Sequence, residues 1–311
     1  MRTLSVVVPA TDRPTTLARC TAALAGADEV VVVDGPRGTG VCEARNSGAR
    51  RATGDIVVFV DSDVVVRPDA LARIRAAFDD FPGLTAVFGS YDDTPPGGTV
   101  AAFRNLLHHH VHHGAAGPAG TFWSGLGAVR RDAFLAAGGF DAERFPLPSI
   151  EDIDLGIRLV AAGARIRLDP SIQGTHLKAW TLRSMVTADF ARRGVPWVRL
   201  LLRSGRAPTE LNLGWRHRLS AALSAAGGVA LLVGRPWPAA AALVTLLGLN
   251  RRFYGLLVRR RGPGAAAVGV GLHVLHHLTA VAAVPTGVLL HVAERRRDRA
   301  GRGVDAERAG R

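Results

Sequence analysis

The sequence has very little cysteine and almost no lysine. Cys20 and Cys42 are its two cysteines, and Lys178 is the single lysine among 39 basic residues. Two cysteines are too few for a disulfide framework or a four-cysteine zinc site, which favours a reducing compartment. We interpret the preference for arginine as a consequence of codon composition rather than of function.

A long apolar run is missing from the N-terminus. In MRTLSVVVPA, Pro9 ends the apolar stretch after a few residues, whereas a secretory signal needs a longer one. The same residues are typical of a buried strand followed by a turn. The whole chain of 311 residues is 48% hydrophobic and 21% charged, with a mean hydropathy of +0.15. This composition excludes a disordered chain and indicates some membrane-embedded length.

Acidic residues are scarce in the second half of the chain. Residues 1–180 hold 18 basic and 20 acidic residues, whereas residues 181–311 hold 21 basic and 6 acidic residues. This excess of arginine requires an anionic partner, either membrane lipid or nucleic acid. The arginines flank apolar runs and form no basic face with interleaved aromatic residues, so we expect anionic lipid and no nucleic acid.

Strand and helix patterns alternate in residues 1–180. The expected strands are Leu4–Val8, Glu29–Asp34, Asp55–Val60, Thr121–Asp132 and Arg165–Leu168. The expected helices are Thr15–Ala25, Cys42–Ala52, Pro68–Phe81 and Ile153–Ala162, with a loop-rich insert at 92–121. The pattern predicts an α/β fold with a mostly parallel sheet and helices on both faces. Ligands of such sheets bind at the carboxyl ends of the strands.

The rest of the chain is basic and apolar. We expect a catalytic domain at 1–185, a basic amphipathic interfacial segment at 186–218 and a disordered basic tail at 294–311. Between them, the apolar segments 219–234, 236–250 and 264–293 are predicted membrane helices. At ~1.5 Å per residue, only 264–293 is long enough for a hydrocarbon core of ~30 Å. A single crossing there conflicts with keeping every arginine cluster cytoplasmic, so the sequence leaves the topology open.

The strongest chemical motif is Phe59-Val60-Asp61-Ser62-Asp63, at the end of an expected buried strand. Two carboxylates at this place, Asp61 and Asp63, can share a hard divalent cation such as Mn²⁺ or Mg²⁺. Such a cation neutralises a diphosphate. The alternative is that these aspartates only cap the following turn.

Further polar residues are expected at the same edge of the sheet. Asp34 ends another strand, where it can accept hydrogen bonds from a base or a ribose, and Arg45 can pair with phosphate or with nearby carboxylates. Glu151 and Asp152 lie in the first turn of a predicted helix, where negative charge is favoured. Helix capping is the alternative role for these two acids.

In their order and spacing, these motifs resemble the inverting glycosyltransferases of family 2, which have the GT-A fold, and in particular their membrane-associated bacterial type. The resemblance covers about Leu4–Arg183. It rests on VVVPA with TDRP, VVVDG, ARNSGARRATGDIVVFVDSD, TFWSGLGAVRRDAFLAAGGFDAERF and SIEDIDLGIRL.

The resemblance implies a role for each candidate residue. The residues implied to bind the nucleotide-sugar are Pro9, Asp12, Asp34, Arg45 and Asp61. The implied ligands of a divalent metal, Mn²⁺ or Mg²⁺, are Asp61, Asp63 and His176, with Asp63 as the direct ligand. Asp152 is implied as the catalytic base beside Glu151, and Trp123, Ser124 and Gly125 are implied on the acceptor side.

The implied activity is transfer of a sugar from a UDP or GDP donor to a lipid or lipid-linked hydroxyl, with inversion, at the cytoplasmic face of the cell membrane. The Q-x-x-R-W motif of processive members has no match, since the nearest text is Arg192-Arg193-Gly194-Val195-Pro196-Trp197, so we expect a single transfer. Two alternatives remain. One is a polyprenyl-phosphate glycosyl synthase similar to dolichyl-phosphate-mannose synthase, and the other is a non-catalytic nucleotide-sugar-binding membrane scaffold.

Two histidine clusters receive no role from the resemblance. The cluster His108–His113 can line the acceptor entrance or bind a soft metal. His273, His276 and His277 lie inside an apolar segment, where ionisable residues are functional candidates. For these three histidines we expect contact with a lipid headgroup or a phosphate.

Overall fold

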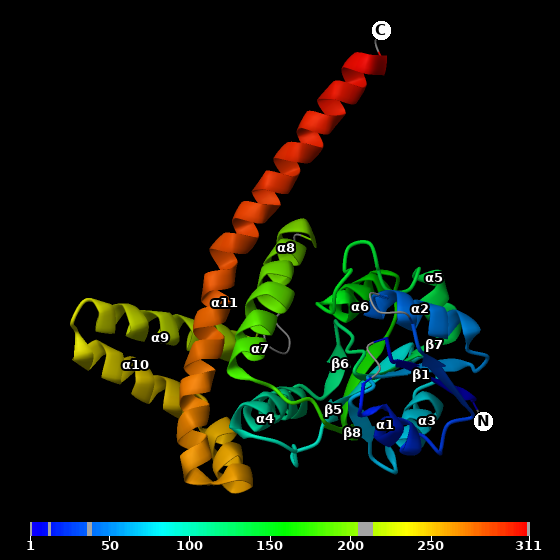
Figure 1. Cartoon of the computed structure of the whole chain (residues 1–311), viewed down its shortest axis with the longest axis horizontal. Helices are drawn as coiled ribbons and strands as arrows, with labels where there is room; N and C mark the ends of the chain where they lie inside the picture. The colour runs from blue at the N-terminus through cyan, green and yellow to red at the C-terminus, as the bar shows by residue number, and fades with distance from the viewer. Residues whose placement is uncertain (1, 12–13, 36–38, 205–213, 310–311) are drawn as a thin grey trace.

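The computed structural model describes residues 2–11, 14–35, 39–204 and 214–309, and it describes side chains as far as Arg296, with the exception of Ser204. The first part of the chain forms a layered body around a sheet, and the last part forms long helices that extend from it (Figure 1).

The sheet has eight strands. They are β1 (Leu4–Pro9), β2 (Glu29–Val33), β3 (Ile56–Val60), β4 (Val64–Val66), β5 (Ala86–Tyr91), β6 (Gly117–Ala119), β7 (Leu126–Arg130) and β8 (Ile166–His176). The order is β2-β1-β3-β7-β5-β8-β4, with β6 paired to β8. Strand β1 is parallel to β2 and β3, and β5 is parallel to β8, whereas the pairs β3–β7, β5–β7, β4–β8 and β6–β8 are antiparallel. The α/β expectation is confirmed, with a sheet that is mixed rather than mostly parallel.

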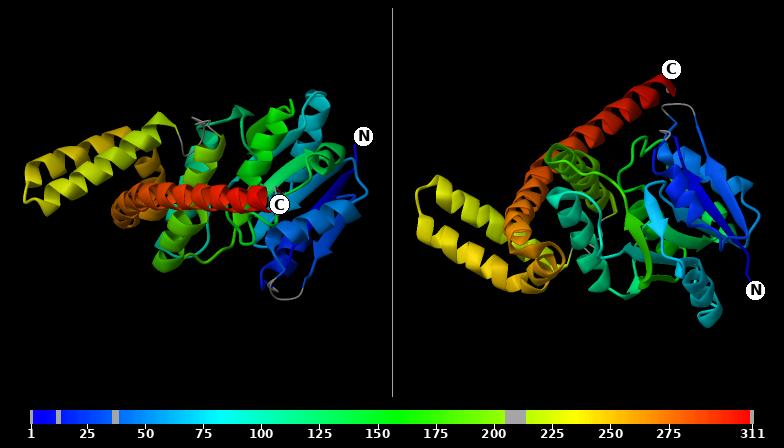
Figure 2. Two further views of the ribbon diagram at one scale, coloured as in Figure 1. Left: turned by 90° about the horizontal axis from the view of Figure 1, so that it is seen from above. Right: turned by 60° about the horizontal axis from the view of Figure 1, so that its bottom comes forward.

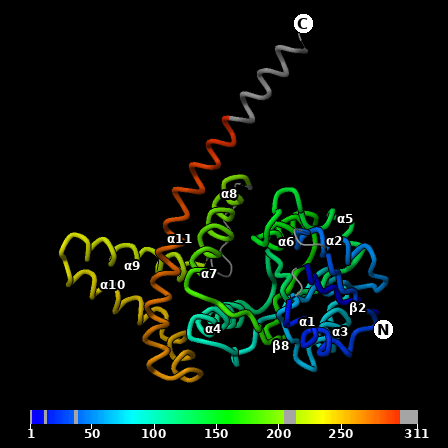
Figure 3. The backbone as a smooth tube through the Cα atoms, in the orientation of Figure 1, coloured from blue at the N-terminus to red at the C-terminus, as the bar shows by residue number. Residues whose placement is uncertain are grey.

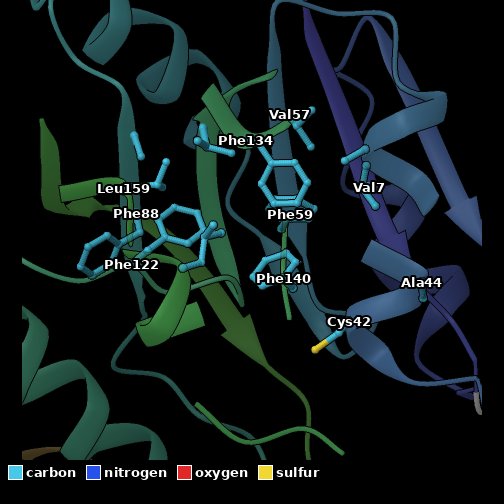
Figure 4. Close-up of a cluster of buried hydrophobic side chains, with 14 of the residues drawn as sticks. Val7, Cys42, Ala44, Val57, Phe59, Phe88, Phe122, Phe134, Phe140 and Leu159 are labelled. Atoms are coloured by element: carbon cyan, nitrogen blue, oxygen red, sulfur yellow. The ribbon is translucent and has the colours of Figure 1, made fainter. Parts of the chain in front are cut away.

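Helices cover both faces of the sheet. They are α1 (Leu17–Ala22), α2 (Val41–Arg51), α3 (Ala70–Asp80), α4 (Thr99–His113), α5 (Arg131–Ala136) and α6 (Glu151–Ala161). Successive residues of β1 point to opposite faces. Val6 therefore packs with the buried residues of α1 and α3, whereas Val7 packs with those of α2, α5 and α6. Figure 4 shows the second cluster, in which the Phe59 ring lies 5.1 Å from both the Phe134 and the Phe140 ring.

The prediction of a loop-rich insert at 92–121 is wrong. Half of it is helix α4, whose residues Ala101–Leu107 are buried. The run of histidines hid this helix, because polar residues read as solvent-exposed when their burial against another element is not known. Strand β5 was also missed, because Gly89 and Ser90 interrupt its apolar run. Gly89 is required there, since a Cβ atom would lie 2.1 Å from the carbonyl oxygen of Ile172 in β8.

The C-terminal helices begin beside α4. They are α7 (Leu182–Thr187), the π-helix η1 (Ala188–Gly194), α8 (Val195–Ser204), α9 (Trp215–Leu232), α10 (Pro236–Leu249) and α11 (Arg251–Ala309). Phe103 of α4, Met185 of α7 and Phe253 of α11 share one buried cluster, which joins this region to the sheet domain. Helices α9 and α10 form a hairpin that projects away from the body, and the second half of α11 extends past α8 (Figures 2 and 3).

Helix α11 contains a break. Gly262 has φ +83°, and the break separates a first segment from a second one that includes the apolar run 264–293. Among the described helices, Arg251–Arg296 is the one with the length and composition to cross a membrane, and 39% of its most apolar window is buried inside the protein. Pro236–Leu249 is apolar but shorter. The helix continues to Ala309, through a tail that we expected to have no regular structure.

Candidate active site

The first candidate residues lie where β1, β2 and β3 end. Pro9 is the last residue of β1 and pairs with Val33 of β2, and Asp34 is exposed directly after β2. Asp61 follows β3 in the same way. Because these three strands are parallel, their carboxyl ends share one edge of the sheet. Asp12 lies outside the described residues.

Backbone hydrogen bonds hold the turn that carries Asp61 and Asp63. The Asp61 N–H donates to the Gly125 carbonyl (3.1 Å), and the Val64 N–H donates to the Asp61 carbonyl (2.9 Å). The Leu177 N–H donates to the carbonyl of Asp63 (2.8 Å). The turn therefore lies between the segment before β7 and the end of β8, both distant in the sequence.

A single buried arginine connects two of the candidate acids. Arg45 of α2 is 4% exposed, and its Nη2 donates to Asp61 Oδ1 (2.6 Å) while its Nη1 donates to Glu151 Oε1 (2.8 Å). The other oxygen of Glu151 accepts from the Ser149 N–H (2.7 Å) at the start of α6. Glu151 is thus a buried ion-pair partner of Arg45. The neighbouring acid, Asp152, is therefore the one that remains available for proton transfer.

Asp152 is held by the segment Trp123-Ser124-Gly125. Its Oδ2 accepts from the Ser124 N–H (3.1 Å), and its Oδ1 accepts from the Ile153 N–H (2.8 Å) in the first turn of α6. Burial and the negative charge of Glu151 raise the pKa of Asp152 to about 6, against the opposing effects of the Ser124 N–H and Arg45. A carboxylate with this pKa is ionised near neutral pH but is more basic than an ordinary aspartate.

Asp63 faces the histidine at the end of β8. His176 Nε2 lies 3.5 Å from Asp63 Oδ2, and His176 Nδ1 lies 2.8 Å from Asn105 Oδ1. The Asn105 Nδ2 donates to the His176 carbonyl (3.3 Å), which fixes the orientation of the amide. His176 Nδ1 therefore carries the proton, and the Nε2 lone pair points toward Asp63.

This pair fits a divalent metal. Two electron-pair donors, an imidazole nitrogen and a carboxylate oxygen, face each other at a separation typical of two ligands on one cation. Asp61 does not join Asp63 and His176 in a set of three ligand atoms within 4.8 Å of one another. Among the described residues, the one such set of histidine, cysteine or carboxylate ligands lies in another part of the structure. Mn²⁺ or Mg²⁺ at Asp63 and His176 would thus need further oxygen ligands from phosphate or water.

An aromatic cluster lies against His176, and the sequence indicated Trp123 and His108 but not Tyr91. The Tyr91 ring is stacked on His176 with a centroid distance of 4.3 Å, and the Trp123 ring lies edge-on to Tyr91 at 4.9 Å. His108 of α4 contacts Tyr91 at 4.3 Å and Trp123 at 4.5 Å. Of the two roles considered for the run His108–His113, the position of His108 favours the one in which it lines the site. Asn105 was missed for the same reason as α4, because nothing local marks a contact 71 residues away.

The Gly138-Gly139-Phe140 turn is built against α2. The Asn46 side chain accepts from the Phe140 N–H (2.8 Å) and donates to the Phe140 carbonyl (2.8 Å). Gly139 has φ +70°, and a Cβ atom on it would lie 2.5 Å from the Asn46 Oδ1. The Phe140 ring contacts Arg45, whose guanidinium carbon lies 5.5 Å from the ring centroid. The turn therefore supports the arginine that holds Asp61 and Glu151.

The mixed sheet, with the Asp61-Ser62-Asp63 turn at its edge and an acid at the start of α6, defines an α/β domain with a GT-A-like fold. Residues 28–135 match the profile of glycosyl transferase family 2. This match agrees with the resemblance of the motifs, and it covers this part of the chain alone.

Curated relatives and a solved structure agree with this class. The chain is 28% identical over 214 residues to the pre-mycofactocin glycosyltransferase of two strains of Mycobacterium tuberculosis. The match covers 60% of this chain and 45% of the relative, so less than half of the relative's length is represented. A mannosyltransferase from Pyrobaculum calidifontis, solved with GDP-Man and Mn²⁺, has a similar fold, with a TM-score of 0.54 and 16% identity, over 91% of this chain and 87% of that one.

Proposed function

We propose that this protein is an inverting, non-processive glycosyltransferase that moves a sugar from a nucleoside diphosphate to the hydroxyl of a lipid or lipid-linked acceptor. The observation that carries this proposal is Asp152, an acid with a pKa of about 6 that the Ser124 N–H orients beside the Arg45 network. The identity of 28% to a glycosyltransferase supports the reaction class. The catalytic unit would be residues 1–185.

Asp152 would act as the general base. A hydroxyl acceptor must lose its proton as its oxygen attacks the anomeric carbon, and a base whose pKa lies near the working pH accepts that proton efficiently. The proton passes to Asp152, the new glycosidic bond forms, and the bond to the diphosphate breaks on the opposite face of the sugar. A single displacement of this kind inverts the anomeric configuration. Trp123 and Ser124 would line the acceptor side.

The donor would bind at the ends of β1–β3. Asp34 would accept hydrogen bonds from the base or ribose of a UDP or GDP sugar, and Pro9 and Asp12 would also contact the donor. A divalent cation, Mn²⁺ or Mg²⁺, would be held by Asp63 and His176 and would supply positive charge to the departing diphosphate. Asp61, which was predicted both to bind the metal and to bind the donor, is held by Arg45 through Oδ1, and we propose that it helps to orient the donor.

A lipid acceptor is proposed from the apolar surface of the C-terminal helices. Leu232 is 88% exposed and Trp237 is 83% exposed at the tip of the α9–α10 hairpin. Large exposed apolar side chains at one site are typical of a membrane or protein contact. Arginines flank these helices, as expected for contact with anionic lipid at the cytoplasmic face. This arrangement would hold the catalytic domain at the membrane surface.

The first test is calorimetric titration of the full-length protein in detergent with UDP, GDP and dTDP, each with and without Mn²⁺. We expect metal-dependent binding of one nucleotide, lost in Asp63→Ala and kept in Asp80→Asn, which alters an exposed carboxylate of α3. If folded protein binds none of the three nucleotides, the proposal is wrong. A second titration with Asp152→Asn should show unchanged nucleotide binding, because Asp152 acts on the acceptor.

A further inference from the structure

Three histidines from two helices meet away from the sheet. His217 lies in α9, and His276 and His277 lie in α11, and a ring nitrogen of each can be chosen so that all three atoms are within 4.8 Å of one another. The His217 ring centroid is 4.7 Å from that of His277 and 5.4 Å from that of His276. His277 is 0% exposed, and His276 is also buried. Because His276 and His277 are buried, the expected contact with a lipid headgroup or phosphate is not possible unless these side chains become exposed.

The nitrogens of this cluster need a partner. Neither Nδ1 nor Nε2 of His277 has a hydrogen-bond partner, and His276 Nε2 has none. Buried imidazole nitrogens are almost always hydrogen-bonded or bound to a metal, because losing their hydration without replacement is unfavourable. A cation bound by one nitrogen of each ring would provide a partner for His276 Nε2 and for one of the two His277 nitrogens.

An aspartate orients one of these histidines. His276 Nδ1 lies 2.8 Å from Asp189 Oδ2, and the other oxygen of Asp189 accepts from Arg104 Nη1 at 2.8 Å. His276 Nδ1 therefore carries the proton, and its Nε2 lone pair faces the cluster. A metal-binding histidine usually donates its other ring N–H to a carboxylate, a backbone carbonyl or water, and this hydrogen bond orients the imidazole. Asp189 lies in the π-helix η1, and π-helical turns occur frequently at functional sites.

We propose that His217, His276 and His277 bind a transition-metal cation, and that Zn²⁺ is the ion this donor set favours. Imidazole nitrogens suit Zn²⁺, whereas Mg²⁺ and Mn²⁺ prefer oxygen. In a tetrahedral site with Zn–N distances of ~2.0–2.1 Å, ligand nitrogens lie roughly 3.4 Å apart, so nitrogens that are now within 4.8 Å of one another would approach by at most about 1.4 Å. Three histidines leave the fourth position to a water molecule or another ligand.

The metal would fasten the α9–α10 hairpin to α11. Its effect would extend to the sheet domain through Asp189, which pairs with Arg104 of α4. The residue after Arg104, Asn105, orients His176. The histidine cluster is separate from the Asp63–His176 pair and differs from it in donor chemistry. The proposal therefore does not depend on the proposed transferase reaction.

The test is metal binding to the full-length protein, purified in detergent without a histidine tag. Protein dialysed after exposure to Zn²⁺ should retain one equivalent by elemental analysis, and Asp63→Ala should retain as much. Loading the Asp63→Ala variant with Co²⁺ should give the intense visible absorption of a tetrahedral nitrogen site, which an oxygen-ligated octahedral ion does not give. His277→Ala should lose both signals. Asp189→Asn should bind roughly 10–100-fold more weakly, as expected when the support of a ligand is removed.

His291→Ala is the matched control, since it removes another buried histidine of α11 outside the cluster and should leave both signals unchanged. The proposal is overturned if folded wild-type protein retains no Zn²⁺ and shows no Co²⁺ absorption. It is also overturned if His277→Ala binds as much metal as the wild type. If His277→Ala does not fold, the Co²⁺ spectrum of the Asp63→Ala protein decides, because its absence is incompatible with a three-histidine site.

Discussion

Arg45 and Glu151 are 106 residues apart in the sequence and form an ion pair with an Nη1–Oε1 distance of 2.8 Å. Both side chains are 5% exposed, and the same guanidinium also binds Asp61. A carboxylate buried at this depth is costly unless a partner compensates its charge. The pair thus ties the end of β3, where we propose that the donor binds, to the start of α6, on the proposed acceptor side.

Arg45→Ala should destabilise the protein strongly. Removing one partner of a buried ion pair leaves an uncompensated charge and costs about 3–5 kcal/mol. Arg45→Lys should recover only part of this loss, because an ammonium group cannot reproduce two directed contacts of a planar guanidinium. Thermal unfolding followed by circular dichroism measures the change. The control is Arg73→Ala, which breaks an exposed pair between α3 and its N-cap residue Asp69 and should cost about 0.3–0.5 kcal/mol. Equal effects of the two alanine variants would contradict a buried network.

Transferase activity should depend on the ionisation of Asp152. Its pKa of about 6 means that the base is protonated and inactive at lower pH. We therefore expect kcat/KM to rise about tenfold per pH unit up to about pH 6 and then to level off. Asp152→Asn should lower kcat by about 10²–10⁴-fold.

The Asp152→Asn variant also distinguishes a phosphate acceptor from a hydroxyl acceptor. An anionic phosphate acceptor needs no base, so a polyprenyl-phosphate glycosyl synthase would tolerate Asp152→Asn with little loss of rate. Asp80→Asn serves as the control, since it removes an exposed carboxylate outside the site.

Asn105→Ala should weaken metal binding at the sheet edge without abolishing turnover. Asn105 fixes which nitrogen of His176 carries the proton, and loss of such a partner lowers metal affinity roughly 10–100-fold. Activity measured against Mn²⁺ concentration should show a higher half-saturating concentration and a nearly unchanged maximum. Asn250→Ala, which removes a different amide contact between α9 and the end of α10, should leave this concentration as in the wild type.

The two glycines before Phe140 should differ in their tolerance of alanine. Gly138 and Gly139 both have positive φ, but Gly138 has open space around it, whereas a Cβ on Gly139 would lie 2.5 Å from Asn46 Oδ1. We expect Gly138→Ala to cost about 1 kcal/mol from backbone strain. Gly139→Ala should cost about 2–4 kcal/mol, because it also disturbs the two hydrogen bonds between Asn46 and Phe140. Chemical denaturation of both variants measures the difference, and equal costs would show that Asn46 is not a constraint.

Binding to anionic vesicles should depend on the tip of the α9–α10 hairpin. Replacing both Leu232 and Trp237 by serine removes two large exposed apolar groups, each worth about 1.5–3 kcal/mol when fully buried. Co-sedimentation with vesicles should fall at least tenfold. Replacing Leu135, an exposed leucine of α5 on the sheet domain, should leave binding unaltered. Unchanged binding of the double variant would exclude the hairpin as the membrane contact.

The first three strands and the Asp61-Ser62-Asp63 turn could be predicted because their signals are local. An uninterrupted run such as Ile56–Val60 marks a strand buried on both faces, and the acids after it necessarily lie at the sheet edge. Helix α4 and strand β5 could not be predicted in this way. Strand β5 includes a glycine and a serine that are buried where it pairs with β8, more than 70 residues further along the chain, and the buried His112 of α4 contacts β5 at the Gly89 carbonyl.

By itself, the amino-acid sequence determined the class of fold, the edge of the sheet that carries the acids and the separate, basic and apolar nature of the C-terminal region. Only the tertiary structure decided which groups meet: Arg45 with Glu151, Asn105 with His176, and His217 with His276 and His277. The physical reason is that apolar periodicity is repeated along the chain and is visible locally. A hydrogen bond or ligand set between distant residues depends on distances of a few ångströms, which only the packing of whole helices against the sheet and against each other establishes.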